Sequence, residues 1–254
     1  MKLNFKRFGE GEPLIVLHGL LGMLDNWQGP GKLLSDAYDV IIVDLRNHGH
    51  SPHSDLHDYD SMVEDVLALM DDLGIPTAHV LGHSMGGKVA MALAQHFPER
   101  LRKLIVADIA PKYYPVHHQK IFDGLRAVQL SQLEKRSDAE AYMLPHIAEP
   151  GVRQFLMKSL YHPDRKSFAW RFNLDGLEAN IERVGQAIDE MDFEGETLFL
   201  RGGRSDYILD EDWADIKVLF PHSYLMTIDG VGHWLHAEKP NEFVAAVKDF
   251  LGNT

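Results

Sequence analysis

The chain of 254 residues contains no cysteine. Disulfides, thiolate metal sites and a thiol nucleophile are therefore excluded, although this absence does not identify a cellular compartment. A chain of this length can form one domain, or a core with an insertion, that needs neither a disulfide nor a metal for stability.

Basic residues are scarce, since 25 Lys and Arg stand against 38 Asp and Glu for a formal net charge of −13. Nucleic acid and anionic membrane surfaces would be repelled, so we expect neither as a partner. We interpret most of the acidic residues as a solvated surface. The sequence does not indicate the oligomeric state.

Long apolar runs are also absent. The amino-terminal stretch MKLNFKRFGEGEP lacks the apolar core of a secretory signal, and no later run reaches the roughly 18 apolar residues that a membrane span needs. We therefore expect a soluble, cytoplasmic protein.

The sequence does contain a G-x-S-x-G motif, GHSMG at residues 82–86, between an apolar run and a small-residue amphipathic run. This strand–turn–helix context is typical of a nucleophilic serine, here Ser84. Glycines two residues to either side leave room for a strained turn that lifts the hydroxyl clear of a sheet. The next N–H, that of Met85, then points to where an acyl oxygen becomes negative. Helix capping alone can also place Gly and Ser at such a junction.

The same stretch reads G-x-x-x-x-G-K from Gly82 to Lys88, as in a phosphate-binding loop. Val89 follows where that loop needs a Ser or Thr hydroxyl to hold Mg²⁺. We therefore disfavour nucleotide binding.

One edge strand and two buried strands are predicted before this motif. Residues 2–8 alternate polar and apolar side chains as an edge strand does, and PLIVL at 13–17 is a continuous apolar run typical of a buried strand. The following turn, HGLLG at 18–22, can bring the N–H of Leu20 beside the serine as a second oxyanion donor. A plain strand-end turn explains this segment equally well.

The next buried strand, VIIV at 40–43, ends in DLRNHGHS. His48, His50 and His53 suggest a metal site, but no helical i,i+4 pair and no carboxylate at ligand spacing accompany them, so we expect no metal. We interpret Asp44 and Arg46 as residues that tie down the loop through charge-assisted hydrogen bonds.

Helices and strands then alternate. A helix at 59–73, with a capping box of Ser61 and Glu64, precedes a strand at 77–81, a helix that ends at Pro98, and a strand at 101–109 that contains Asp108. This alternation predicts an α/β fold with a mostly parallel sheet.

From residue 112 to 194 helical patterns dominate and no strand is predicted. We expect core segments at 1–111 and 195–254, with a helical cap at 112–194 that lies over the site and walls the substrate pocket. A remote helical subdomain is the alternative. The candidate substrate contacts are Leu21, Tyr113, Trp170 and Trp234, with Tyr114 and Phe172 as further aromatic residues of the insertion.

The sheet resumes at 197–200 and closes with a strand at 223–228, directly before GVGHW at 230–234. A serine hydroxyl needs an imidazole to take its proton, and the imidazole needs a carboxylate on its other nitrogen. The order Ser84, acid, His233 is that of α/β hydrolases. His233 is the best base because it follows the last strand, where the carboxyl ends of the strands converge.

These residues resemble the α/β-hydrolase superfamily and, within it, the small YbfF-type esterases. The resemblance covers essentially the whole chain through HGLLGMLDNW, DLRNHGHSP, GHSMGGKVAMALA, ADIAP, WRFNL and GHWLHAEKP. It implies an eight-stranded type of core, with a helical cap between the sixth and seventh strands. It also implies ester hydrolysis through an acyl-serine, no cofactor, and oxyanion donors at Leu20 and Met85.

The acid has two candidates. Asp206 follows the penultimate strand, where most of the superfamily keeps its acid, whereas the resemblance to the subfamily implies Asp108 of the ADIAP stretch. We favour Asp108 and keep Asp206 as the alternative.

The predicted function is hydrolysis of small carboxylic esters with short or medium acyl chains. A thioesterase or a C–C bond hydrolase would use the same residues, and a slow-turnover receptor or a partner-binding scaffold could share the fold. Ser84 in place of an aspartate excludes the chemistries that form an alkyl-aspartate ester.

Overall fold

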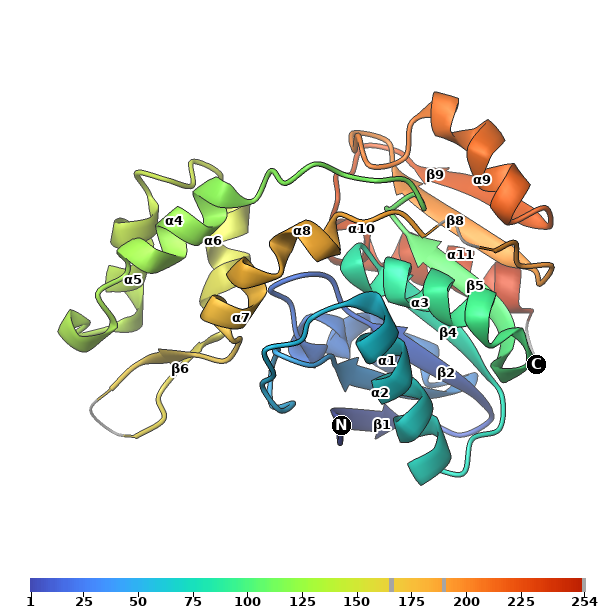
Figure 1. Ribbon diagram of the computed structural model, residues 1–254, viewed down its shortest axis with the longest axis horizontal. Helices are drawn as coiled ribbons and strands as arrows, with labels where there is room; N and C mark the ends of the chain where they lie inside the picture. The colour runs from blue at the N-terminus through green and yellow to red at the C-terminus, as the bar shows by residue number, and fades with distance from the viewer. Residues whose placement is uncertain (165–166, 189–190, 253–254) are drawn as a thin grey trace.

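The computed structural model describes residues 1–164, 167–188 and 191–252, and a seven-stranded sheet lies at its centre (Figure 1). The strand order is β1-β3-β2-β4-β5-β8-β9, and all neighbouring pairs are parallel except β1 with β3. The predicted mostly parallel sheet is therefore confirmed. Its strands are β1 (Asn4–Phe8), β2 (Glu12–Leu17), β3 (Tyr38–Asp44), β4 (Ala78–His83), β5 (Leu101–Ala107), β8 (Thr197–Gly202) and β9 (Ser223–Ile228).

Helices cover both faces of the sheet because successive strand side chains point to opposite sides. Leu14 and Val16 pack in one buried cluster with residues of α1 and α11, while Ile15 and Leu17 pack in another with residues of α2 and α3. The helices of this part are α1 (Gln28–Leu34), α2 (Tyr59–Asp72), α3 (Met85–His96), α9 (Trp213–Leu219), α10 (Leu235–Glu238) and α11 (Pro240–Leu251), with 3-10 turns η1 (Leu24–Trp27), η2 (Pro98–Arg100) and η4 (Asp210–Asp212).

A second group of helices leaves the sheet after β5 and returns to it at β8, and Figure 1 shows this group to one side of the sheet. It has its own buried cluster, which includes Phe122, Met143 and Leu156 and also takes in Leu21 from the core. We call this segment the insertion; its division from the core at residues 112 and 194 stays a prediction. Its elements are α4 (Gln119–Ala127), η3 (Leu130–Gln132), α5 (Arg136–Met143), α6 (Pro150–Met157), β6 (Leu160–Tyr161), β7 (Ala169–Trp170), α7 (Leu174–Ala179) and α8 (Ile181–Val184).

The sheet is one strand shorter than the resemblance implied. The insertion leaves after the fifth of seven strands rather than after the sixth of eight, because only one antiparallel strand, β1, precedes β2. The prediction of no strands within the insertion is also wrong, since β6 pairs with β7 in an antiparallel ribbon. Strands of two residues are too short to show a period-two pattern in the sequence.

The start of α2 differs from the predicted capping box. The helix begins at Tyr59, and the Asp58 carboxylate accepts a hydrogen bond from the Ser61 N–H at 2.9 Å. Asp58 is therefore the N-cap, and Ser61 already lies in the first turn. In the described part of the chain, none of the helices has the length and apolarity that crossing a bilayer requires.

Candidate active site

Ser84 lies in the turn between β4 and α3, with φ of 52° and ψ of −120°. A positive φ is uncommon for a residue other than glycine and stores strain. Close packing holds the turn: a Cβ added to Gly82 would lie 2.1 Å from the Gly86 carbonyl oxygen, and one added to Gly86 would lie 2.4 Å from that of Leu17. Glycine is therefore required at both positions of the G-x-S-x-G spacing.

His233 follows β9 and contacts a buried carboxylate. Its Nδ1 lies 2.7 Å from Oδ2 of Asp108, which follows β5 and is fully buried. The same carboxylate accepts the Gly202 N–H on Oδ1 at 2.9 Å and the Ser205 hydroxyl on Oδ2. Because the carboxylate is surrounded by donors, Nδ1 of His233 carries the proton and Nε2 is left to accept one.

Asp206, the alternative acid, is exposed and lines an open groove with Arg204. No hydrogen bond or ion pair within the described ranges joins it to His233. Instead, Tyr207 stacks on the His233 ring, with centroids 4.0 Å apart and an interplanar angle of 20°. The Tyr207 hydroxyl donates to Nε2 of His117 at 2.8 Å.

Sequence reasoning missed Ser205 and Tyr207. The one signal available was position, since both residues flank the alternative acid in the turn after β8.

The turn after β2 packs against the strand–helix turn that contains Ser84. A Cβ added to Gly19 would lie 3.1 Å from the Ser84 Cβ, so the backbone of this turn runs directly beside the serine. The next residue, Leu20, lines the same cavity as Ser84. Met85 is the first residue of α3, and an N–H at that position has no carbonyl one turn earlier within the helix. Both predicted oxyanion donors therefore belong to segments that border Ser84.

Two buried histidines, His18 and His48, brace the turn after β2. Nε2 of His18 accepts the Leu45 N–H, and Nε2 of His48 accepts the Leu21 N–H, both at 3.0 Å. The two rings meet edge to face at 4.9 Å. Burial holds the pKa of both imidazoles below the ordinary value, so both stay neutral and able to accept.

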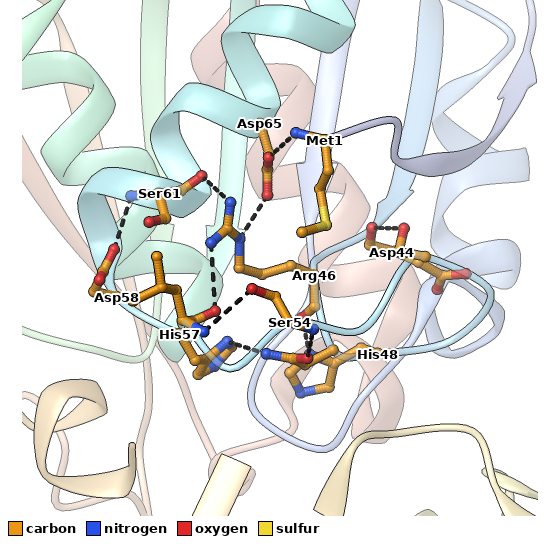
Figure 2. Close-up of polar contacts among 12 residues, drawn as sticks. Met1, Asp44, Arg46, His48, Ser54, His57, Asp58, Ser61 and Asp65 are labelled. Carbon is orange, nitrogen blue, oxygen red and sulfur yellow. Dashed lines mark hydrogen bonds and ion pairs between the residues drawn. The ribbon is translucent and has the colours of Figure 1, made fainter. Parts of the chain in front are cut away.

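The loop after β3 is tied down by charged side chains, as predicted (Figure 2). Asp44 accepts the Leu24 N–H at 2.7 Å and the His50 N–H at 2.9 Å. The Arg46 guanidinium points at Asp65, with Nε 2.6 Å from Oδ2. This buried network fixes the loop that supplies His48 to the brace.

The three histidines of that loop make different contacts. His48 belongs to the brace, whereas His50 accepts from the Arg171 guanidinium and His53 donates to the Arg171 carbonyl, both at 3.3 Å. Over residues 1–164, 167–188 and 191–252, no group of three or more His, Cys, Asp or Glu side chains is placed to hold a metal ion.

A cavity of about 230 Å³ opens beside Ser84 and His233. Its walls come from both parts of the chain and are mainly apolar. Leu20, Leu21, Trp27 and Trp234 come from the core, and Ile121, Val152, Phe155 and Leu156 from the insertion.

Two predicted substrate contacts do not line this cavity. Tyr113 is 55% exposed, and Trp170 is buried within the insertion, where its ring stacks on Phe172 at 5.4 Å. Leu21 and Trp234 do line it. The sequence offered no way to choose among the aromatic residues of the insertion, because helix packing decides which of them face the core.

Among the described residues, no Asp, Glu, Lys or Arg side chain lines the cavity, and several of its polar lining groups are histidines. Burial lowers the pKa of His118 to about 4 and that of His236 to about 3, and holds that of His83 well below its ordinary value. These imidazoles are therefore neutral near pH 7. The cavity consequently presents an uncharged wall beside the serine.

Known proteins share both the sequence and the architecture. Residues 12–240 match the family described as alpha/beta hydrolase fold. The chain is 36% identical to Esterase YbfF of Escherichia coli over the full length of both proteins. It is also 36% identical to the mouse sn-1-specific diacylglycerol lipase ABHD11, over 94% of this chain and 80% of that protein.

A solved structure named marine microorganism esterase superposes with a TM-score of 0.95 at 39% identity, and the match covers 98% of this chain and 99% of that one. The predicted resemblance is confirmed by these matches and by the sheet described above. The chain belongs to the α/β hydrolase family.

Proposed function

We propose that this protein is a serine hydrolase that cleaves uncharged carboxylic esters through an acyl-Ser84 intermediate. One observation carries the proposal: a serine in a strained strand–helix turn lines the same cavity as a histidine whose Nδ1 is bonded to a buried aspartate. The relatives and the superposed structure named esterase or lipase support the ester class.

In the first step, Nε2 of His233 takes the Ser84 proton as the hydroxyl oxygen attacks the ester carbonyl carbon. Asp108 holds the imidazole in the tautomer that leaves Nε2 free and stabilises the imidazolium that forms. The N–H groups of Leu20 and Met85 hold the oxyanion of the tetrahedral intermediate. The protonated His233 then gives its proton to the leaving alkoxide, and the alcohol departs.

In the second step, a water molecule attacks the acyl-serine. His233 takes its proton and returns it to Ser84, which releases the carboxylic acid. No cofactor enters this scheme.

The acyl group occupies the apolar cavity. Its volume of about 230 Å³ lies below the roughly 300–1,000 Å³ of drug-sized ligand pockets, which favours short or medium acyl chains. A free carboxylate on the acyl group would lose its hydration without gaining a cationic partner, because the described lining has no Lys or Arg and His83, His118 and His236 are neutral. Neutral esters are therefore the preferred class.

The test is a panel of p-nitrophenyl esters from acetate to dodecanoate, a succinate monoester, and matched acyl-CoA thioesters. We expect the highest kcat/KM on short or medium neutral esters. Ser84→Ala should lower kcat by about 10⁶ if the triad acts as a unit. Ser223→Ala, at a buried serine whose hydroxyl has no partner in the described ranges, is the matched control.

Retention of more than a tenth of the activity by Ser84→Ala would refute the nucleophile. Preference for thioesters over esters of equal chain length would replace the ester class. The cytoplasmic location stays a prediction outside this experiment.

A further inference from the structure

Two segments connect the sheet with the insertion: residues 111–114 on the way out and residues 185–188 on the way back. We call them the two crossings, and both lie beside a buried lysine. Lys88 lies one turn beyond Ser84 on α3, and its side chain is inaccessible to solvent. Its Nζ donates to the carbonyl oxygens of Lys112 at 2.9 Å, of Gly185 at 3.2 Å, and of Gln186. Lys112 lies at the predicted start of the insertion, and residues 185–186 follow α8 on the stretch that leads back to β8.

The crossings are also bonded to each other. The Tyr114 N–H donates to the Gly185 carbonyl at 2.8 Å, and the Ile188 N–H to that of Pro111 at 2.7 Å. A Cβ added to Gly185 would lie 2.2 Å from the Tyr114 carbonyl oxygen, so the two backbones touch. The two crossings therefore pack directly against each other, and the Lys88 ammonium is bonded to both.

Two aromatic rings also lie close to the ammonium. Nζ lies 4.9 Å from the Tyr114 ring centroid and 6.0 Å from that of Tyr59. The Tyr59 hydroxyl donates to the Val184 carbonyl at 2.6 Å, one residue before the returning crossing. Ring faces and carbonyl oxygens are both groups that attract a cation.

Tyr114 extends this junction to the catalytic groups. Its hydroxyl accepts the Ala110 N–H at 2.9 Å and donates to the Tyr207 carbonyl. Tyr207 is the residue that stacks on His233, and Ala110 follows Asp108 by two positions. Lys88, Tyr114, Tyr207 and Ser84 also line one narrow cavity beneath the crossings.

The sequence pattern G-x-x-x-x-G-K ends at this lysine, but its ammonium is turned to backbone carbonyls rather than to a phosphate. Burial of an ammonium is costly unless its donors are satisfied. The carbonyl oxygens of Lys112, Gly185 and Gln186 supply acceptors for these donors.

We propose that Lys88 is a positioning residue that pins both crossings to α3 and so fixes the insertion over the cavity at a set distance from Ser84. Its ammonium donates to the backbone carbonyls of the crossings, and its proposed role is exerted through them. The kinetic part of this inference rests on the proposed ester hydrolysis, whereas the structural part does not.

The test is Lys88→Met, which keeps an unbranched side chain and removes the donors. Lys103→Met is the matched control, because the Lys103 ammonium donates to the Phe250 carbonyl at 3.0 Å and pairs with Glu196 at 3.0 Å, neither of which belongs to a crossing. Hydrogen–deuterium exchange is measured in both variants, together with kcat and KM for acetate and octanoate esters.

For Lys88→Met we expect amide exchange in residues 112–188 to accelerate at least tenfold while β2, β4 and β5 keep their protection. The octanoate-to-acetate ratio of kcat/KM should fall about tenfold, mainly through KM, and kcat on acetate should stay within about threefold. Lys103→Met should change neither readout.

A uniform rise in exchange across sheet and insertion, with an unchanged octanoate-to-acetate ratio, would show a merely structural lysine and overturn the proposal. If Lys88→Met does not fold, Tyr59→Phe serves instead, because it removes the bond to the Val184 carbonyl beside the returning crossing. This variant must accelerate exchange within residues 181–188, and unchanged exchange there would refute the proposal that the crossings are pinned to the core at this point. If the wild-type protein hydrolyses no ester, the proposed function fails and the exchange result alone decides on Lys88.

Discussion

Replacing Asp108 by Asn tests the assignment of the acid with a change of only one atom. In the native protein Oδ2 of Asp108 accepts from Nδ1 of His233 at 2.7 Å and from the Ser205 hydroxyl, and Oδ1 accepts from the Gly202 N–H at 2.9 Å. An asparagine can keep its oxygen on Gly202, which turns its amide N–H₂ toward the imidazole. Nδ1 must then accept a hydrogen bond, so the proton moves to Nε2.

An imidazole protonated on Nε2 cannot take the proton of Ser84. The same exchange costs about 10⁴ in kcat in a serine protease triad, and we expect a loss of that order here because the Asp108 carboxylate is fully buried and water cannot replace it. Asp206→Asn should cost less than about tenfold, the equivalent of an ordinary hydrogen bond. Asp206 is exposed and has no bond to His233 within the described ranges.

The assay is kcat on an acetate or butyrate p-nitrophenyl ester for both single variants and the double variant, with thermal melting to verify folding. The double variant should match Asp108→Asn. A crippling Asp206→Asn with a mild Asp108→Asn would refute the assignment. A large loss in the double variant alone would show that the acid is shared.

Three further predictions concern stability and specificity. Burial lowers the pKa of His57 from 6.5 to about 4. Because the unfolded chain binds the proton first as the pH falls, the contribution of neutral His57 to the free energy of unfolding is complete above pH 6.5 and is lower by about 2 kcal/mol at pH 5. An unchanged urea midpoint between pH 7.5 and 5 would contradict this. Phe155→Ala should enlarge the acyl cavity and raise the octanoate-to-acetate ratio of kcat/KM about tenfold, whereas the exposed Tyr113→Ala should leave it unchanged. Gly86→Ala should destabilise the fold by about 3 kcal/mol and lower Tm by roughly 10 °C, because the added Cβ would lie 2.4 Å from a backbone oxygen. Gly151→Ala is the control, since open space surrounds Gly151, and it should melt like the wild type.

The centre of the sheet could be predicted from the sequence because strands such as β2 and β3 are buried on both faces. The runs at 13–17 and 40–43 are continuous and apolar, and each lies within an observed strand. The first strand was also recognisable, since its alternating pattern is that of the antiparallel edge strand β1. Boundaries were less certain: β5 ends at Ala107 rather than at residue 109.

The turn at Ser84 could be predicted because its constraint is local. Glycines at fixed spacing and the flanking strand and helix specify a strained turn without any distant contact. The placement of Asp108 against His233 could not be predicted in this way. The two residues are 125 positions apart, and Asp108 follows β5, which β8 separates from β9. The choice between the two aspartates therefore depends on side-chain placement and on the bonds to Gly202 and Ser205.

The walls of the cavity were beyond the sequence for a related reason. Helix periodicity shows that the insertion has a buried side, but not which residues turn toward the core. Trp170, the largest candidate of the insertion, packs within it, whereas Ile121 and Phe155, which no sequence pattern singled out, line the cavity. The role of Lys88 depends likewise on two crossings that only folding brings together.

The central claim is that an acyl group is transferred to Ser84, and rapid-quench mass spectrometry of the intact protein tests it most directly. A p-nitrophenyl butyrate burst should give a mass increase of one butyryl group, about 70 Da, located on the peptide that contains residues 82–88. His233→Ala should abolish the adduct on the burst timescale. An adduct on another residue, or full turnover with no adduct at Ser84 at any quench time, would contradict the account.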